Sequence, residues 1–137
     1  MPESAQTPYD AIGGELAVRK LVDTFYRHMD ELPEAYGIRK LHPPDLAGSA
    51  QKLFMFLSGW LGGPQLFVQR FGHPRLRARH LPFPIGPSER DQWLHCMHLA
   101  MQECIADQAI REGLFRALSD LADHMRNTST LQHPPQG

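Results

Sequence analysis

Apolar residues recur along much of the chain at spacings of three and four positions, which places them on one face of an α-helix. The first such segment follows Gly13-Gly14, and a second covers residues 46–61 before Gly62-Gly63-Pro64 ends it. The apolar face of the first is formed by Val18, Leu21, Val22, Phe25 and Met29. The apolar face of the second is formed by Leu53, Phe56, Leu57 and Trp60. No segment shows the strict alternation of a half-buried strand, so the pattern predicts an all-α chain.

The second half of the chain predicts two more long helices. Ser88 and Asp91 have the spacing of a capping box and predict that a helix begins there. The apolar face of this helix is formed by Trp93, Met97, Ala100, Met101 and Cys104. That of the last helix is formed by Ile110, Leu114, Leu118, Leu121 and Met125. Short helices are expected over residues 65–71 and 74–80, so the architecture has about four main helices.

The length of 137 residues fits one domain, which we place at residues 8–127. Residues 1–7 are expected to form a loose arm, and the chain from Asn127 onward is expected to fray into a disordered tail over 128–137. The uncharged stretch 53–69 is interrupted by glycine and proline, so it does not predict a membrane span. The first residues lack the pattern of a secretory signal, so we expect a cytoplasmic protein.

The charge balance and the two cysteines bear on two questions: whether nucleic acid is a partner and whether a disulfide forms. The 14 basic and 15 acidic residues nearly cancel, so nucleic acid is not expected as a partner. Cys96 and Cys104 on one helix would lie about 12 Å apart along its axis. That separation is too large for a disulfide, so we expect two free thiols.

His80 is the most informative of the eight histidines. It closes a short cationic segment that contains Arg75, Arg77 and Arg79, and the proline-rich loop 81–87 follows it. A rigid loop would hold the imidazole in one orientation, as suits a histidine that binds haem iron from one side. The alternative is a histidine at a helix C-terminus, favoured there by the helix dipole. Composition leaves both interpretations open.

Two aromatic residues with a polar hydrogen are further candidates. Tyr26 and Trp93 lie beside or on predicted apolar faces, and burial of either requires a hydrogen-bond partner. A bound gas that carries negative charge would be such a partner, whereas ordinary core aromatics are the alternative. His95 and His98 have a spacing that suits a metal, but they point away from the Trp93–Met97 face and are expected to be solvated.

Several stretches together resemble one known family. The most specific are residues 72–85, which read GHPRLRARHLPFPI, and residues 89–97, which read ERDQWLHCM. Weaker matches are residues 8–14, 22–26, 42–46, 56–64 and 122–127. Over residues 8–127 the sequence is similar to the group II truncated haemoglobins. The resemblance implies a two-over-two helical sandwich around haem b, iron protoporphyrin IX.

The resemblance also implies roles for individual residues. His80 matches the proximal iron ligand, Tyr26 the distal hydroxyl donor and Trp93 the distal indole donor. His42 matches a third distal residue, and Ser49 and Leu53 fall on the distal helix above the haem. The predicted haem contacts are Phe25, Lys52, Phe56, Leu76, Arg79, Phe83 and Met97. Among these, Lys52 and Arg79 match positions that meet the haem propionates.

The expected function is reversible binding of oxygen, carbon monoxide or nitric oxide at the iron, in oxygen binding, transport, storage or sensing. Several donors around one ligand slow its escape, which favours storage, sensing or chemistry over delivery. Nitric oxide dioxygenation or peroxidase chemistry is the enzymatic alternative, and it needs an external reductase. A third hypothesis is that the chain is a helical interaction module without haem. A monomer and a homodimer are both compatible with the sequence.

His42 has three interpretations. Its imidazole can donate a hydrogen bond to a bound ligand, or bind the iron itself in the ligand-free protein when it is neutral. The third interpretation is a hydrogen bond to Tyr26 or to water. Pro43-Pro44 stiffens the chain directly after His42, which raises the cost of moving the ring to the iron.

Overall fold

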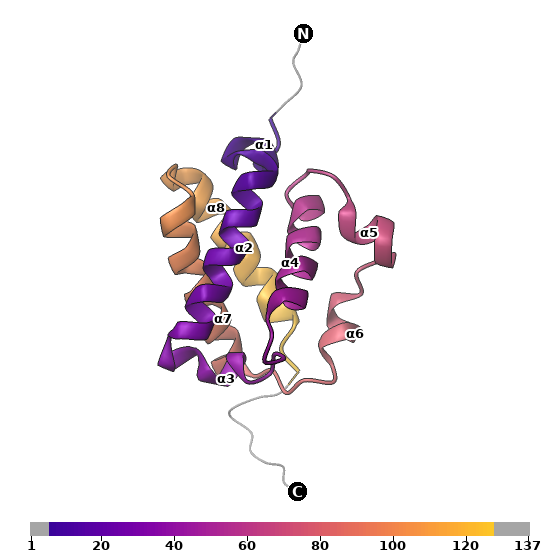
Figure 1. The fold of residues 1–137 in the computed structure, drawn as a ribbon, viewed down its shortest axis with the longest axis vertical. Coiled ribbons are helices and arrows are strands. Elements are labelled where there is room, and N and C mark those ends of the chain that lie inside the picture. Colours follow the sequence, from indigo (N-terminus) through magenta and orange to yellow (C-terminus); the bar gives the residue numbers. More distant parts are fainter. Residues whose placement is uncertain (1–5, 128–137) are drawn as a thin grey trace, which may run out of the picture.

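The computed structural model describes residues 6–127, which contain helices and no strand (Figure 1). The all-α prediction is therefore confirmed over this part of the chain. The helices are α1 (Pro8–Ile12), α2 (Gly14–Glu31), η1 (Pro33–Ala35), α3 (Tyr36–Arg39), α4 (Ala47–Trp60), α5 (Leu66–Phe71), α6 (Leu76–His80), α7 (Pro87–Cys104) and α8 (Gln108–His124). The predicted tail, residues 128–137, and the first five residues of the predicted arm lie outside the described residues.

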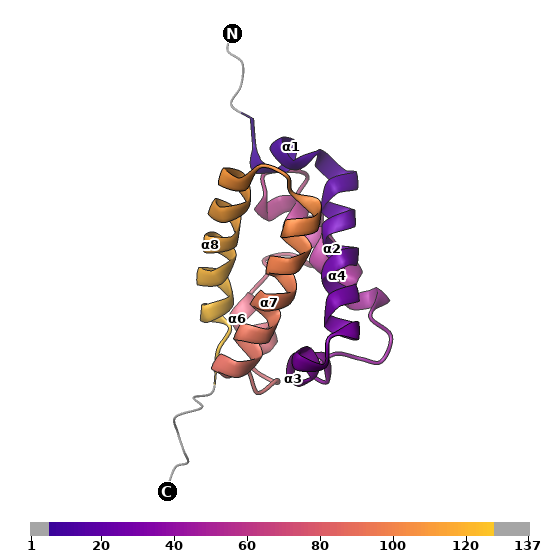
Figure 2. The ribbon, with the colours of Figure 1, turned by 90° about the vertical axis from the view of Figure 1, so that its left-hand side faces the viewer.

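The four long helices form two layers, with α2 and α4 in one and α7 and α8 in the other (Figures 1 and 2). The layers meet mainly where α2 packs on α7. The predicted apolar face of α2 is buried at this contact, as are Met97, Ala100 and Met101 of α7. Helical periodicity therefore identified the core faces of α2 and α7 correctly.

Helix α4 differs from its prediction because it is apolar on two sides. Of its predicted stripe only Leu57 is fully buried, whereas Phe54 and Met55, outside the stripe, join the core. Leu53 and Phe56 face a cavity instead. One helix therefore separates the core from an internal space, and a single stripe cannot describe both of its faces.

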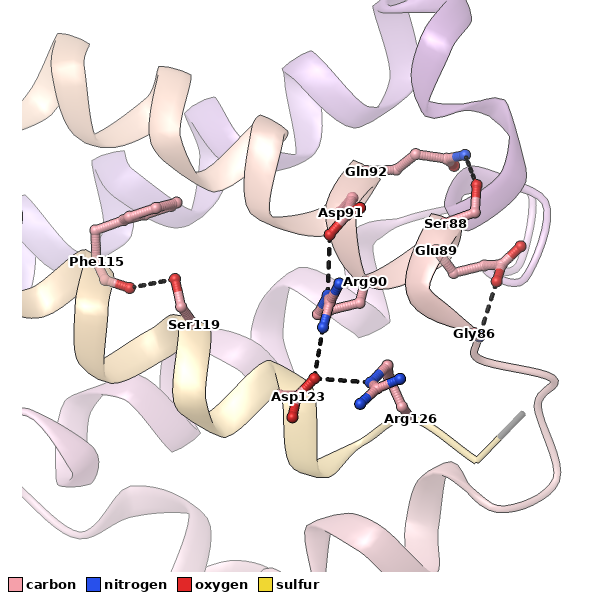
Figure 3. Close-up of polar contacts among 10 residues, drawn as sticks. All are labelled: Gly86, Ser88, Glu89, Arg90, Asp91, Gln92, Phe115, Ser119, Asp123 and Arg126. Atoms are coloured by element: carbon pink, nitrogen blue, oxygen red, sulfur yellow. Dashed lines mark hydrogen bonds and ion pairs between the residues drawn. The ribbon is translucent and has the colours of Figure 1, made fainter. Parts of the chain in front are cut away.

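Helices α6 and α7 begin at residues other than those that the sequence predicted. Helix α7 begins at Pro87, and Glu89 accepts a hydrogen bond from the backbone N–H of Gly86 at 2.8 Å (Figure 3). The prediction of a cap at Ser88 is wrong because proline, with its fixed φ, suits the first helical position. Helix α6 begins at Leu76 rather than at Pro74, since Arg75 has a left-handed φ of 48° that no α-helix continues.

The chain around α1 is ordered by close contact with the end of α4. The backbone N–H of Tyr9 donates to Leu61 O at 2.9 Å, and Thr7 caps α1 by accepting from the N–H of Asp10. A Cβ at Gly63 would lie 2.5 Å from the Tyr9 ring, so only glycine fits there. Thr7 is thus part of the fold rather than of a loose arm. None of the described helices is long and apolar enough to cross a membrane.

Candidate functional site

A cavity of about 480 Å³ lies between α4, α6, α7 and α8, and its size is that of a small-molecule site. All of the predicted site residues except two line it, namely Tyr26, His42, Ser49, Lys52, Leu53, Phe56, Leu76, Arg79, His80, Phe83 and Trp93. These residues come from four helices, α2, α4, α6 and α7, and from two connecting segments, and the fold brings them to one space. The rest of the wall includes the apolar side chains of Leu118 and Leu121 on α8 and of Met125 directly after it. Their helical stripe predicted core packing, and no sequence signal indicated that they face a cavity.

Phe25 and Met97 are the two exceptions, and their predicted place on the wall is corrected. Both are fully buried and form the layer behind the wall. The Phe25 ring packs edge-on against Tyr26, with ring centroids 4.8 Å apart, and against Trp93 at 5.0 Å. Phe25 therefore packs against the two aromatic residues that line the cavity, but it does not line the cavity itself.

His80 ends α6 with one ring nitrogen already engaged. Its Nδ1 lies 2.6 Å from the carbonyl oxygen of Leu76, one turn earlier in the same helix. A carbonyl only accepts, so Nδ1 carries the proton and Nε2 keeps a free lone pair. This arrangement is typical of metal-binding histidines, which donate the other ring N–H to a carbonyl or carboxylate. His80 is half-buried and lines the cavity, and this tautomer leaves Nε2 able to bind a metal.

Tyr26 of α2 and Trp93 of α7 line the same cavity, and each side chain carries one polar hydrogen. Burial raises the pKa of Tyr26 far above its ordinary value, so the hydroxyl stays protonated and remains a donor. It donates to Ser49 O at 3.4 Å, much longer than the usual O–H···O distance of about 2.7–2.8 Å. The indole N–H of Trp93 has no hydrogen-bond partner among residues 6–127. Of these two donors at the cavity, the Tyr26 hydroxyl forms only a long hydrogen bond, and the Trp93 indole N–H has no acceptor among residues 6–127.

His42 is held as a neutral ring beside Tyr26, with ring centroids 5.8 Å apart. Its Nδ1 lies 2.9 Å from the carbonyl oxygen of Ile38 and so carries the proton. Burial lowers the pKa of His42, the hydrogen bond to Ile38 opposes this effect, and the charge of Arg39 lowers the pKa further. In this state Nε2 accepts hydrogen bonds and does not donate them. This geometry is compatible both with acceptance of a hydrogen bond from Tyr26 or water and with binding to iron, and only donation to a ligand requires a second proton.

The cavity also has cationic side chains on its wall, Lys52 of α4 and Arg79 of α6. The Arg79 Nε donates to Pro74 O at 2.6 Å, and its guanidinium lies 5.3 Å from the centroid of the Phe67 ring. These contacts hold Arg79 at the wall, and its Nη1 and Nη2 groups form no hydrogen bond within residues 6–127. Such cations pair well with carboxylates of a bound group.

His95 and His98 are exposed, as the sequence indicated. His95 Nε2 lies 3.5 Å from a Glu34 carboxylate oxygen, and the His98 ring packs edge-on against Phe115. Within residues 6–127 no group of three or more His, Cys, Asp or Glu side chains is placed to hold a metal ion. A site built from several such side chains is therefore not found in this part of the chain.

The comparisons with known proteins agree with this geometry. The model of the bacterial-like globin family matches residues 7–127. The Group 2 truncated hemoglobin YjbI of Bacillus subtilis is 46% identical over 132 residues, which cover 96% of this chain and 97% of that protein. The chain belongs to the group II truncated haemoglobins.

Solved structures show the same family. The group II 2-on-2 hemoglobin of Agrobacterium tumefaciens is 48% identical with a TM-score of 0.89, over 93% of this chain and 98% of that one. The truncated oxygen-avid haemoglobin of Bacillus subtilis is 45% identical with a TM-score of 0.81, over 89% and 100% of the two chains. As a truncated globin, the protein binds haem and, at the haem, a diatomic gas.

Sequence reasoning missed residues of this globin that act on the loop after His80. Asn127, expected to begin the frayed tail, instead forms hydrogen bonds with backbone atoms of residues 80–85. Its partners lie more than forty positions away in sequence. The match of residues 122–127 to the family was the signal available, and it did not assign Asn127 a role.

Proposed function

We propose that this globin holds haem b in the cavity through Nε2 of His80 and retains oxygen for storage or sensing. The observation that carries the proposal is the hydrogen bond from His80 Nδ1 to Leu76 O, because it leaves Nε2 as the nitrogen with a free lone pair. The apolar wall suits a porphyrin ring, and Lys52 and Arg79 suit its propionates. The free indole N–H of Trp93 fits a ligand that brings its own acceptor atoms.

Retention of the gas follows from the donors on the opposite wall. When haem is bound, its iron supplies the site for the diatomic gas and transfers electron density to it. Tyr26 and Trp93 then donate to an acceptor with partial negative charge, which they stabilise as fixed, preorganised donors. A hydrogen bond to a charged group contributes about 1.5–3 kcal/mol, so two such donors slow release strongly. Slow release suits storage or sensing better than delivery.

The test of the iron ligand is His80→Gly, with free imidazole as the rescue. We expect the purified variant to lose its haem or to show an altered ferrous spectrum, and added imidazole to restore the wild-type spectrum. His73→Gly is the matched control, since His73 lies in the exposed segment before α6 and not on the cavity wall. Normal haem content and an unchanged ferrous spectrum in His80→Gly would overturn the proposal.

A further inference from the structure

Helix α6 carries the iron ligand of the proposed function, yet core packing does not hold it. It has five residues, and none of them is buried. A helix this short is unstable by itself, because nucleation costs more than its few backbone hydrogen bonds return. The position of His80 therefore depends on contacts that reach α6 and its loop from elsewhere in the fold.

Asn127 supplies the first of these contacts. Its Nδ2 donates to His80 O at 3.1 Å and to Phe83 O at 2.8 Å, and its Oδ1 accepts from the N–H of Ile85 at 2.9 Å. The backbone N–H of Asn127 also donates to Ile85 O at 2.8 Å. Asn127 is the only asparagine in the chain. Its amide thus binds both ends of the loop that follows the iron ligand, with donor and acceptor atoms both used.

Arg77 supplies the second contact, from α6 itself. Its Nη1 donates to His124 O at 2.7 Å and to Arg126 O at 3.2 Å. His124 is the last residue of α8, where carbonyl groups lack helical partners and the helix dipole favours a cation. The two contacts connect α6 and its loop to the same short segment, residues 124–127.

That segment is fixed in turn to the core helix α7. Asp123 Oδ1 accepts from Arg90 Nη1 at 2.5 Å and from Arg126 Nε at 2.7 Å, and Arg90 Nε donates to Asp91 at 2.9 Å (Figure 3). The hydrogen bonds of Arg126 and Arg90 lower the pKa of Asp123, so its carboxylate stays charged near neutral pH. A continuous set of polar contacts therefore leads from α7 through the end of α8 to His80.

We propose that Arg77 and Asn127, held by the end of α8, form a latch that sets the position of His80 against the haem iron. The latch rests on the proposed function, since it acts through the iron ligand. Asn127 and Arg77 are positioning residues, because neither touches the iron. Loss of the latch leaves α6 free to tilt, which changes the length and angle of the iron–histidine bond and weakens haem retention.

The test compares Asn127→Ala and Asn127→Asp with wild type in the haem-loaded protein. The first readout is the iron–histidine stretching band of the ferrous, ligand-free protein in resonance Raman spectra, and the second is haem transfer to an excess of apomyoglobin. We expect the band to shift or broaden in both variants and haem loss to be about tenfold faster, the effect of roughly one net hydrogen bond. Asn127→Asp keeps the acceptor for Ile85 and loses both donors, so it isolates the contacts to His80 and Phe83.

The matched control is Asp107→Ala, which removes a hydrogen bond at the opposite end of α8. Asp107 caps this helix by accepting from the N–H of Ile110 at 3.0 Å. We expect it to lower the melting temperature without moving the Raman band. Arg77→Met tests the second half of the latch, and it should move the band in the same direction as Asn127→Ala, with less than additive effects in the double variant.

The outcomes separate the latch from the function on which it rests. An iron–histidine band at the wild-type position in Asn127→Ala and Arg77→Met, with haem loss no faster than in Asp107→Ala, would overturn the latch. The proposed function would still stand if His80→Gly had lost its haem. A wild-type ferrous spectrum in His80→Gly would overturn the proposed function itself.

Discussion

The two walls of the cavity that we propose as the haem site are stabilised in different ways. Tyr26 and Trp93 on the distal side come from helices whose neighbouring residues form the core, and the fully buried Phe25 ring supports both. His80 on the proximal side ends a short helix without a buried residue, and polar contacts to the end of α8 position it. Packing therefore fixes the proposed hydrogen-bond donors for the gas, whereas hydrogen bonds position the proposed iron ligand. We expect mutations on the distal side to affect folding and those on the proximal side to affect haem.

The largest effect is expected from truncation of a distal support. Phe25→Ala removes a fully buried ring and leaves a cavity, which should lower the free energy of unfolding by about 3–5 kcal/mol. Leu76→Ala, on the exposed proximal helix, should cost less than about 1 kcal/mol. Denaturant unfolding of both variants measures the difference. Equal losses would contradict the contrast between a packed and a polar wall.

The next effect concerns the distal donors themselves. Tyr26→Phe and Trp93→Phe each remove a donor and retain an aromatic ring, so oxygen release should become about 10- to 100-fold faster in each variant. Stopped-flow displacement of oxygen by carbon monoxide gives the rates. The double variant should show a non-additive effect, because both donors serve one ligand. If oxygen release from both single variants and the double variant matched the wild-type rate, Tyr26 and Trp93 would act only in core packing.

The smallest effect is expected from the charge of His42. Its pKa lies below 6.5, so the ring is neutral at pH 7 and gains a proton only as the pH falls below that value. Protonation makes Nε2 a donor, and we expect oxygen release to slow as the pH falls through this range. Release rates of wild type and His42→Phe between about pH 5 and 8 provide the measurement. A pH dependence of equal size in the two proteins would assign it to another group.

Part of this site was predictable from the sequence because the underlying signals are local. The period of apolar residues in α2 and α7 predicts which face is buried, since helical geometry depends on near neighbours. The motif around His80 and the motif around Trp93 predicted residues that the fold brings to one cavity. The same period could not tell Phe25, behind the wall, from Phe56, on it, because both are simply apolar positions on helices.

The sequence by itself determined the four main helices, the family and the residues expected at the haem. Only the tertiary structure decided the states of the two histidines, because the carbonyls of Leu76 and Ile38 select the protonated nitrogen of His80 and His42. It also decided the role of Asn127, whose partners at His80, Phe83 and Ile85 lie 42 to 47 positions away. Hydrogen bonds over such distances depend on the path of the whole chain, which no local pattern of residues encodes.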